Sequence, residues 1–157
     1  MYDKTKAVCF SGHRTLYEPQ EVIENRLEQT VRDCIFKGAD TFIAGGALGF
    51  DMLAEHLILR LCLEYPHIRL ALALPCPPEQ QTLKWNDQQK AEYKDIMERA
   101  NYWSVLSKTY TSDCMLSRNR VMVDNSSTLI YYLRQNRGGT FYTVNYARKM
   151  GLYLLRI

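Results

Sequence analysis

The stretch Gly45-Gly46-Ala47-Leu48-Gly49-Phe50-Asp51 decides the fold that we expect for this chain. It follows a short apolar segment, residues 41–44, and precedes a segment with helical spacing of apolar residues, 51–64. Three glycines in five residues are costly unless the backbone needs them, because glycine loses the most conformational freedom on folding. The stretch is therefore typical of a turn from a strand into a helix, a place where backbone N–H groups can hold a phosphate or a ribose.

Two further glycine turns stand at similar places. Ser11-Gly12-His13-Arg14 follows the first apolar run of the chain, and Arg137-Gly138-Gly139-Thr140 precedes its last helical pattern. A helix N-terminus carries unpaired N–H groups and a partial positive charge of about 0.5 e, which attract phosphates. Three such turns in a small chain, two of them beside arginine, predict a pocket for a phosphate-bearing nucleotide or sugar.

Strand-like and helix-like segments alternate along the whole sequence. We expect strands at 7–11, 41–44, 68–74, 102–106, 128–133 and 152–157, and helices at 19–37, 51–64, 87–100, 115–125 and 140–150. Residues 79–86 are polar and follow three prolines, so we expect a turn of helix or a mobile loop there. This alternation is typical of βαβ units. It predicts a single α/β domain over 1–157, Rossmann-like, with a mostly parallel, doubly wound sheet and helices on both faces.

Composition narrows the function classes. The chain has 157 residues and a formal net charge of +3, which does not demand a nucleic-acid partner. No apolar run approaches the ~20 residues that cross a bilayer, and the first predicted strand begins too early to leave room for a signal peptide. We therefore expect a cytoplasmic protein with no membrane partner.

The five cysteines and three histidines do not form a metal-binding pattern. There is no CxxC pair and no HxH or HxxxH spacing, so we expect no metal and reduced thiols. Cys9, Cys34 and Cys62 lie in apolar stretches and are expected in the core, whereas Cys76 and Cys114 lie near predicted turns and can border a ligand site.

The candidate ligand-binding residues come from the three turns and one helix. They are Gly12, His13, Arg14, Gly45, Gly46, Gly49, Asp51, Arg118, Asn119, Gly138, Gly139 and Thr140. Arginine makes bidentate contacts to phosphate, which suits Arg14 and Arg118. Asp51 either accepts hydrogen bonds from ribose hydroxyls or caps its helix, and Thr140 either meets a phosphate oxygen or is the N-cap of the last helix.

Other residues of the predicted loops and helices can be interpreted as structural as well as functional. Arg120 and Asp124 are spaced as an i, i+4 ion pair, which favours a structural role for both. Three aromatic residues in predicted loops, Tyr17, Trp85 and Tyr110, can stack on a base or simply pack.

Taken together, these motifs resemble the SLOG superfamily, which joins the DNA-processing SMF/DprA proteins and the Lonely Guy phosphoribohydrolases, and they are most similar to its YpsA-like branch of small, uncharacterised bacterial proteins. The resemblance covers residues 7–157. It is carried by Ser-Gly-His-Arg (11–14), Gly-Gly-Ala-Leu-Gly-x-Asp (45–51), Leu-Ala-Leu-Pro-Cys-Pro (72–77), Arg-Asn-Arg (118–120) and Gly-Gly-Thr-Phe-Tyr-Thr-Val-Asn (138–145). It implies a Rossmann-like fold that binds a nucleotide-derived ligand, such as an ADP-ribose-like or NAD-like molecule or a nucleoside phosphate, as a binder or sensor.

The resemblance also implies two alternatives. Lonely Guy enzymes are nucleoside 5′-monophosphate N-glycosidases that carry Pro-Gly-Gly-x-Gly-Thr-x-x-Glu, and alignment on Gly139-Thr140 places Thr143 where that Glu belongs. Threonine cannot stabilise an oxocarbenium-like centre or activate water, and only Asp51 or Asp124 is left as a substitute, so we lean against an enzyme. Single-stranded DNA binding, as in DprA, is the second alternative. We expect no required cofactor, a small-molecule nucleotide partner and, as a further possibility, a homo-oligomer.

Overall fold

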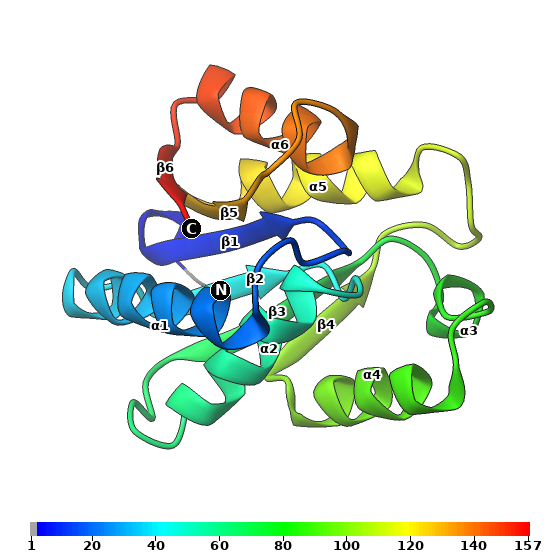
Figure 1. Cartoon of the computed structure of the whole chain (residues 1–157), viewed down its shortest axis with the longest axis horizontal. Helices are drawn as coiled ribbons and strands as arrows, with labels where there is room; N and C mark the ends of the chain where they lie inside the picture. The colour runs from blue at the N-terminus through cyan, green and yellow to red at the C-terminus, as the bar shows by residue number, and fades with distance from the viewer. Residues whose placement is uncertain (1–2) are drawn as a thin grey trace.

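Six parallel strands form the centre of the structure, a computed structural model that describes residues 3–157 (Figure 1). The strands are β1 (Ala7–Gly12), β2 (Thr41–Ala44), β3 (Arg69–Leu74), β4 (Tyr102–Val105), β5 (Thr128–Tyr132) and β6 (Tyr153–Arg156). Their order in the sheet is β4-β3-β2-β1-β5-β6. Every pair of neighbouring strands is parallel.

Helices cover both faces of this sheet (Figure 1). The α-helices are α1 (Gln20–Phe36), α2 (Phe50–Leu61), α3 (Pro78–Gln81), α4 (Asp87–Arg99), α5 (Cys114–Asp124) and α6 (Gly138–Lys149), and a short 3₁₀ turn, η1 (Lys4–Lys6), precedes β1. In Figure 1, α1, α2 and α4 lie on one side of the sheet, and α5 and α6 lie on the other. The prediction of a doubly wound, Rossmann-like α/β fold is therefore confirmed.

The central strands β1, β2 and β5 are buried along almost their whole length, which explains their nearly continuous apolar sequences, whereas the edge strand β4 is exposed. Because successive side chains point to opposite faces, Val8 and Phe10 join the core that α1, α2 and α4 cover, whereas Cys9 joins the core under α5 and α6. Burial raises the pKa of Cys9 to about 12, so this thiol is inert at neutral pH.

The order of the strands places a crevice beside β1. The chain builds outward from β1 through β2 and β3 to β4, and then returns to the other side of β1 with β5. In open α/β sheets, ligands bind at such a switch point, outside the carboxyl ends of the strands. The turns after β1, β2 and β5 all lie at this edge, as the sequence predicted.

The structure corrects several local predictions. Helix α6 begins at Gly138 with Arg137 as its N-cap, so Thr140 is a buried residue of the first turn and not the cap. At the start of α5, Asp113 is the N-cap residue, but its side chain makes no capping hydrogen bond. The predicted Arg120–Asp124 pair does not form: Arg120 donates to Ser117 Oγ (3.2 Å), and Asp124 accepts from the Tyr146 hydroxyl (2.7 Å).

Glycine is required in the first two turns by the protein's own packing. A Cβ on Gly12 would overlap the ring of Phe50, which is fully buried at the start of α2. Gly49 has a φ of +79°, and a Cβ there would overlap the backbone of Arg14. The Phe50 N–H also donates to the His13 carbonyl (3.1 Å), so the turn after β1 and the start of α2 are in direct contact.

We predict that Gly12→Ala lowers the free energy of unfolding by about 1–3 kcal/mol, because the added methyl forces the buried Phe50 ring to move. Gly139→Ala is the matched control: its Cβ would meet only Asn119 Nδ2, at 4.0 Å, and alanine is the better helix former. Urea unfolding of the two variants checks this difference. Equal stabilities would contradict the packing role assigned to Gly12.

Candidate functional site

A cavity of about 340 Å³ lies at the switch point, and all three glycine turns contribute to its wall. It is lined by Phe10, Ser11, Gly12, His13, Arg14, Ala47, Asp51, Met115, Arg118, Asn119, Gly139 and Thr140. Most of the predicted ligand-binding residues are therefore brought together. The candidates outside the lining are Gly45, Gly46, Gly49 and Gly138. Ligand binding by any of the twelve candidate residues stays a prediction.

Two hydroxyls face this cavity without a partner. Ser11 at the end of β1 is 7% exposed and Thr140 in the first turn of α6 is 6% exposed. Within residues 3–157, neither hydroxyl makes a hydrogen bond. The start of α6 is likewise free of a side-chain cap. Neither oxygen is among the fully buried atoms that lack a partner in residues 3–157, so both are accessible to solvent, and these groups are free to bind a polar ligand in place of water.

Arg14 provides an available positive charge at the cavity. Its side chain is exposed, and across the described part of the chain it forms no ion pair. Asn119 lies opposite, on α5; its Oδ1 accepts from Arg118 Nε (2.7 Å), which leaves its amide N–H groups for other partners. Both residues keep donors that can reach an anion.

Arg118 is a structural clamp as well as a lining residue. It is 4% exposed, and its Nη1 donates to the carbonyl of Gly45, and at 3.4 Å to that of Ala73. A Cβ on Gly45 would meet the same guanidinium. Arg118 thus ties α5 to the turn after β2, and part of its hydrogen-bonding capacity is spent inside the protein.

Two carboxyl groups on α2 lie beneath the turn after β2. Asp51 Oδ2 accepts from the N–H groups of Gly45 (3.2 Å) and Ala47 (3.3 Å), and Glu55 Oε1 accepts from that of Gly46 (2.9 Å). Burial raises the pKa of Asp51, and the positive charge of Arg118 opposes that rise. Burial, and then the charge of Asp51, raise the pKa of Glu55 well above its usual value.

The two carboxyls differ in what opposes the effect of burial. The charge of Arg118 is the largest influence against it at Asp51, whereas the charge of Asp51 adds to it at Glu55, so Asp51 releases its proton more readily than Glu55. The Oε2 of Glu55 is the buried side-chain atom that lacks a hydrogen bond among the residues described. The Gly46 turn is held from the other side as well, since Gln81 Nε2 donates to the Gly46 carbonyl (2.9 Å) and the Tyr93 hydroxyl donates to Gln81 Oε1 (2.9 Å).

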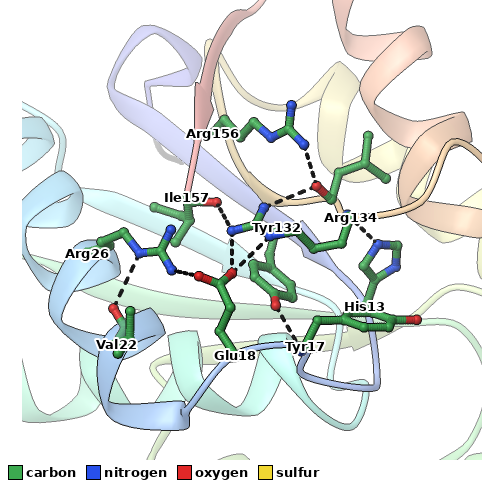
Figure 2. A network of polar contacts seen from close by, with 10 residues as sticks. His13, Tyr17, Glu18, Val22, Arg26, Tyr132, Arg134, Arg156 and Ile157 are labelled. Carbon is green, nitrogen blue, oxygen red and sulfur yellow. Dashed lines mark hydrogen bonds and ion pairs between the residues drawn. The ribbon is translucent and has the colours of Figure 1, made fainter.

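His13 links two of the site's loops. Its Nε2 accepts from the backbone N–H of Arg134 (2.8 Å), as Figure 2 shows. Burial and the charge of Arg134 lower the pKa of His13, so the ring is neutral at pH 7. The Arg134 guanidinium in turn binds Glu18 (2.5 and 2.9 Å) and lies 4.4 Å from the centre of the Tyr132 ring. His13 therefore braces the turn between β5 and α6 and offers no positive charge to a phosphate.

Sequence reasoning missed some members of the site. Ser11 belongs to the Ser-Gly-His-Arg motif but was not among the candidate residues. No sequence pattern pointed to Met115 as a lining residue. Glu55 could have been found, because it lies four residues after Asp51 and three before the fully buried Ile58, on one helical face. The cysteines expected to border the site, Cys76 and Cys114, are buried and lie outside its lining.

Two further searches of residues 3–157 bear on the class of protein. No group of three or more histidine, cysteine or acidic side chains in this range is placed to hold a metal ion. In the same range, no helix combines the length and the apolar character that a membrane crossing requires.

The fold and the position of the cavity define a Rossmann-like α/β protein with its site at a topological switch point. The chain belongs to the YpsA family, described as the YspA SLOG family, whose profile matches residues 10–152. It is 28% identical over 130 residues to a UPF0398 protein of Halalkalibacterium halodurans, covering 81% of this chain and 68% of that one. It is 29% identical over 120 residues to the uncharacterised SPbeta prophage-derived protein YoqJ of Bacillus subtilis, covering 69% of each chain.

Solved structures of DNA processing protein A, DprA, share the fold. The Helicobacter pylori protein superposes with a TM-score of 0.66 at 18% identity, over 96% of this chain and 64% of that one; its structure is described in terms of a single-stranded DNA binding mode. The Streptococcus pneumoniae protein gives 0.68 at 16% identity, over 98% and 50%. This chain therefore spans from half to just under two thirds of the DprA chains.

The raised pKa of Glu55 leads to a pH prediction. Because its folded-state pKa lies above the unfolded value near 4.5, the folded state binds more protons in between. Stability from this group is thus fully present below pH 4.5 and is lost as the pH rises toward the folded-state pKa. Glu55→Gln keeps the acceptor for Gly46 and removes the titration, so urea unfolding across pH 4–8 will show the variant gaining on the wild type as pH rises.

The difference between the two proteins isolates Glu55 from other titrating groups. His13, whose pKa is lowered, shifts stability in the opposite direction, but it does so in both proteins. A difference that stays constant with pH, or a wild type that gains on the variant, would show that Glu55 is ionised in the folded state.

Proposed function

We propose that this protein binds a phosphorylated, nucleotide-derived ligand in the switch-point cavity and acts as a binder or sensor. The observation that carries this proposal is the set of cavity groups without a side-chain partner in residues 3–157: the uncapped start of α6 and the accessible hydroxyls of Ser11 and Thr140. Backbone N–H groups at a helix N-terminus, together with hydroxyls, are the usual ligands of a phosphate.

The charges at the cavity support an anionic ligand. Arg14 and Arg118 bring positive charge to the lining, and Asp51 is the acidic residue among the lining residues; the raised pKa of Glu55 disfavours a second negative charge beside it. The site therefore has an excess of positive charge before a ligand enters. Arg14, which has no ion-pair partner within residues 3–157, is proposed to make the direct contact, and Arg118 to act from beneath.

Asp51 is proposed to hold a ribose as well as the turn above it. It lines the cavity, yet its Oδ2 is bound to two backbone N–H groups. A substitution at Asp51 would therefore disturb the turn and any ribose contact together. For this reason, the test of the proposal uses a residue whose change leaves the turn after β2 intact.

The contacts of Thr143 support binding without turnover. Thr143 stands at the position of the enzyme family's glutamate and is 2% exposed. Its hydroxyl donates to the Gly139 carbonyl (2.8 Å) and is therefore hydrogen-bonded within α6. Asp124 accepts from Tyr146 and is not a lining residue. An N-glycosidase of the Lonely Guy type would thus depend on Asp51 alone.

Single-stranded DNA binding is the second candidate, and the likeness to DprA favours it. The uncapped helix and Arg14 would then take a backbone phosphate of the strand. Such binding requires several phosphate contacts and falls steeply with salt. Because the net charge of this chain is only +3, we place this candidate second.

Gly139→Asp tests the proposal with little cost to the fold. A Cβ at this position would make only an ordinary contact with Asn119 Nδ2 (4.0 Å), and an aspartate in the first turn is favourable to the helix, but its carboxylate would occupy the phosphate position. We expect the wild type to be stabilised by about 2.7 kcal/mol at a ligand concentration of 100 Kd, and Gly139→Asp to lose at least ~10-fold in affinity. Thermal unfolding against AMP, ADP, ADP-ribose, NAD and a short single-stranded DNA measures both effects.

Gly139→Ala serves as the control, since it adds bulk without charge. The proposal fails if none of the nucleotides stabilises the wild type, or if Gly139→Asp binds as tightly as Gly139→Ala. Stabilisation by the DNA alone would favour the second candidate. Release of free base from a bound nucleotide would show that the protein is an enzyme.

A further inference from the structure

The Tyr17 ring is exposed but held in place. It follows the turn after β1 and is 48% exposed. Its backbone N–H donates to the Tyr132 hydroxyl (2.9 Å; Figure 2), and its own hydroxyl accepts from Gln135 Nε2 (2.7 Å). A surface tyrosine normally keeps its rotamers, whereas this one has already lost that freedom, which lowers the entropic cost of using the ring as a binding surface.

Tyr17 also lies next to the cavity. Its ring contacts that of His13, a lining residue, with ring centres 5.5 Å apart and planes at 80°, and Figure 2 shows the two side by side. Gln135 lies between Tyr17 and the start of α6, because its Oε1 accepts from Nε of Arg137, the N-cap residue (3.2 Å). Tyr17 and Gln135 therefore bridge the two loops that lead to the phosphate-binding wall.

The Gln135 amide groups that make no hydrogen bond within residues 3–157 can distinguish one base from another. An amide has two N–H donors and two oxygen lone pairs, and one of each is used by Tyr17 and Arg137. One donor and one acceptor are left. This combination matches the N7 acceptor and N6 amino group of adenine, whereas the corresponding edge of guanine, N7 and O6, presents two acceptors.

We propose that Tyr17 and Gln135 form a base subsite that selects an adenine nucleotide, with the base stacked on the Tyr17 ring and its N6/N7 edge read by Gln135. This inference rests on the proposed function, since it places the phosphate of the same ligand at the start of α6. Aromatic stacking supplies the affinity, and the amide supplies the choice of base.

Calorimetric titration of AMP, GMP, ribose 5-phosphate and inorganic phosphate tests the subsite. Base stacking implies that Tyr17→Leu weakens AMP binding by about 5- to 150-fold and leaves ribose 5-phosphate binding unchanged. Tyr17→Phe keeps the ring and should retain most of the affinity. Gln135→Ala should remove the preference for AMP over GMP. Tyr153→Leu, which changes an exposed tyrosine at the amino end of β6, is the control and should bind as the wild type does.

The outcomes separate the subsite from the site itself. If the wild type binds AMP and ribose 5-phosphate equally, or if Tyr17→Leu weakens both ligands alike, the base subsite is refuted while phosphate binding stands. If the wild type binds none of the four compounds, the proposed function fails and the subsite fails with it.

Discussion

The bond from the buried Arg118 guanidinium to the Gly45 carbonyl is the interaction on which the rest of the site depends. It joins α5, which covers one face of the sheet, to the turn that leads into α2, which covers the other. A guanidinium that is 4% exposed must be balanced, and Asp51 supplies the charge. The charge of Asp51 in turn raises the pKa of Glu55. Arg118 and Asp51 thus hold the turn after β2 through its carbonyl and its N–H groups, and their charges act on the pKa of Glu55.

The glycine turns serve two different purposes. In the turns after β1 and β2, glycine is required because neighbouring protein atoms leave no room for a Cβ, as at Gly12 against Phe50. At the start of α6, a Cβ on Gly139 would meet only Asn119 Nδ2, at an ordinary contact distance of 4.0 Å, so packing within residues 3–157 does not require the glycine there. The first two turns build the rigid wall of the cavity, and the third presents the free N–H groups. This division of roles is what makes the α6 terminus the proposed phosphate site.

The sequence predicts the fold well because the inner strands of the sheet are largely buried, so that runs such as residues 68–74 are almost wholly apolar. It also predicts which turns meet, since parallel strands bring their carboxyl ends to one edge. It fails where two local rules compete. Thr140 is a good N-cap in isolation, but the helix starts two residues earlier and turns its hydroxyl toward the cavity. The sequence predicts His13 as a phosphate ligand, but in the structure its ring nitrogen accepts a hydrogen bond from the backbone N–H of Arg134, a residue 121 positions away.

The most direct test of this account is an NMR titration of the ¹⁵N-labelled protein with AMP, following backbone amide shifts. The account requires the largest shifts at the end of β1, residues 11–14, and at Gly139 and Thr140 in the first turn of α6. A larger cavity, of about 890 Å³ and lined in part by Lys6, Lys37 and Arg156, includes residues at the amino ends of β5 and β6 and is a natural internal comparison. Shifts confined to that cavity, or no saturable shifts at all, would contradict the central claim that the switch-point cavity binds the nucleotide.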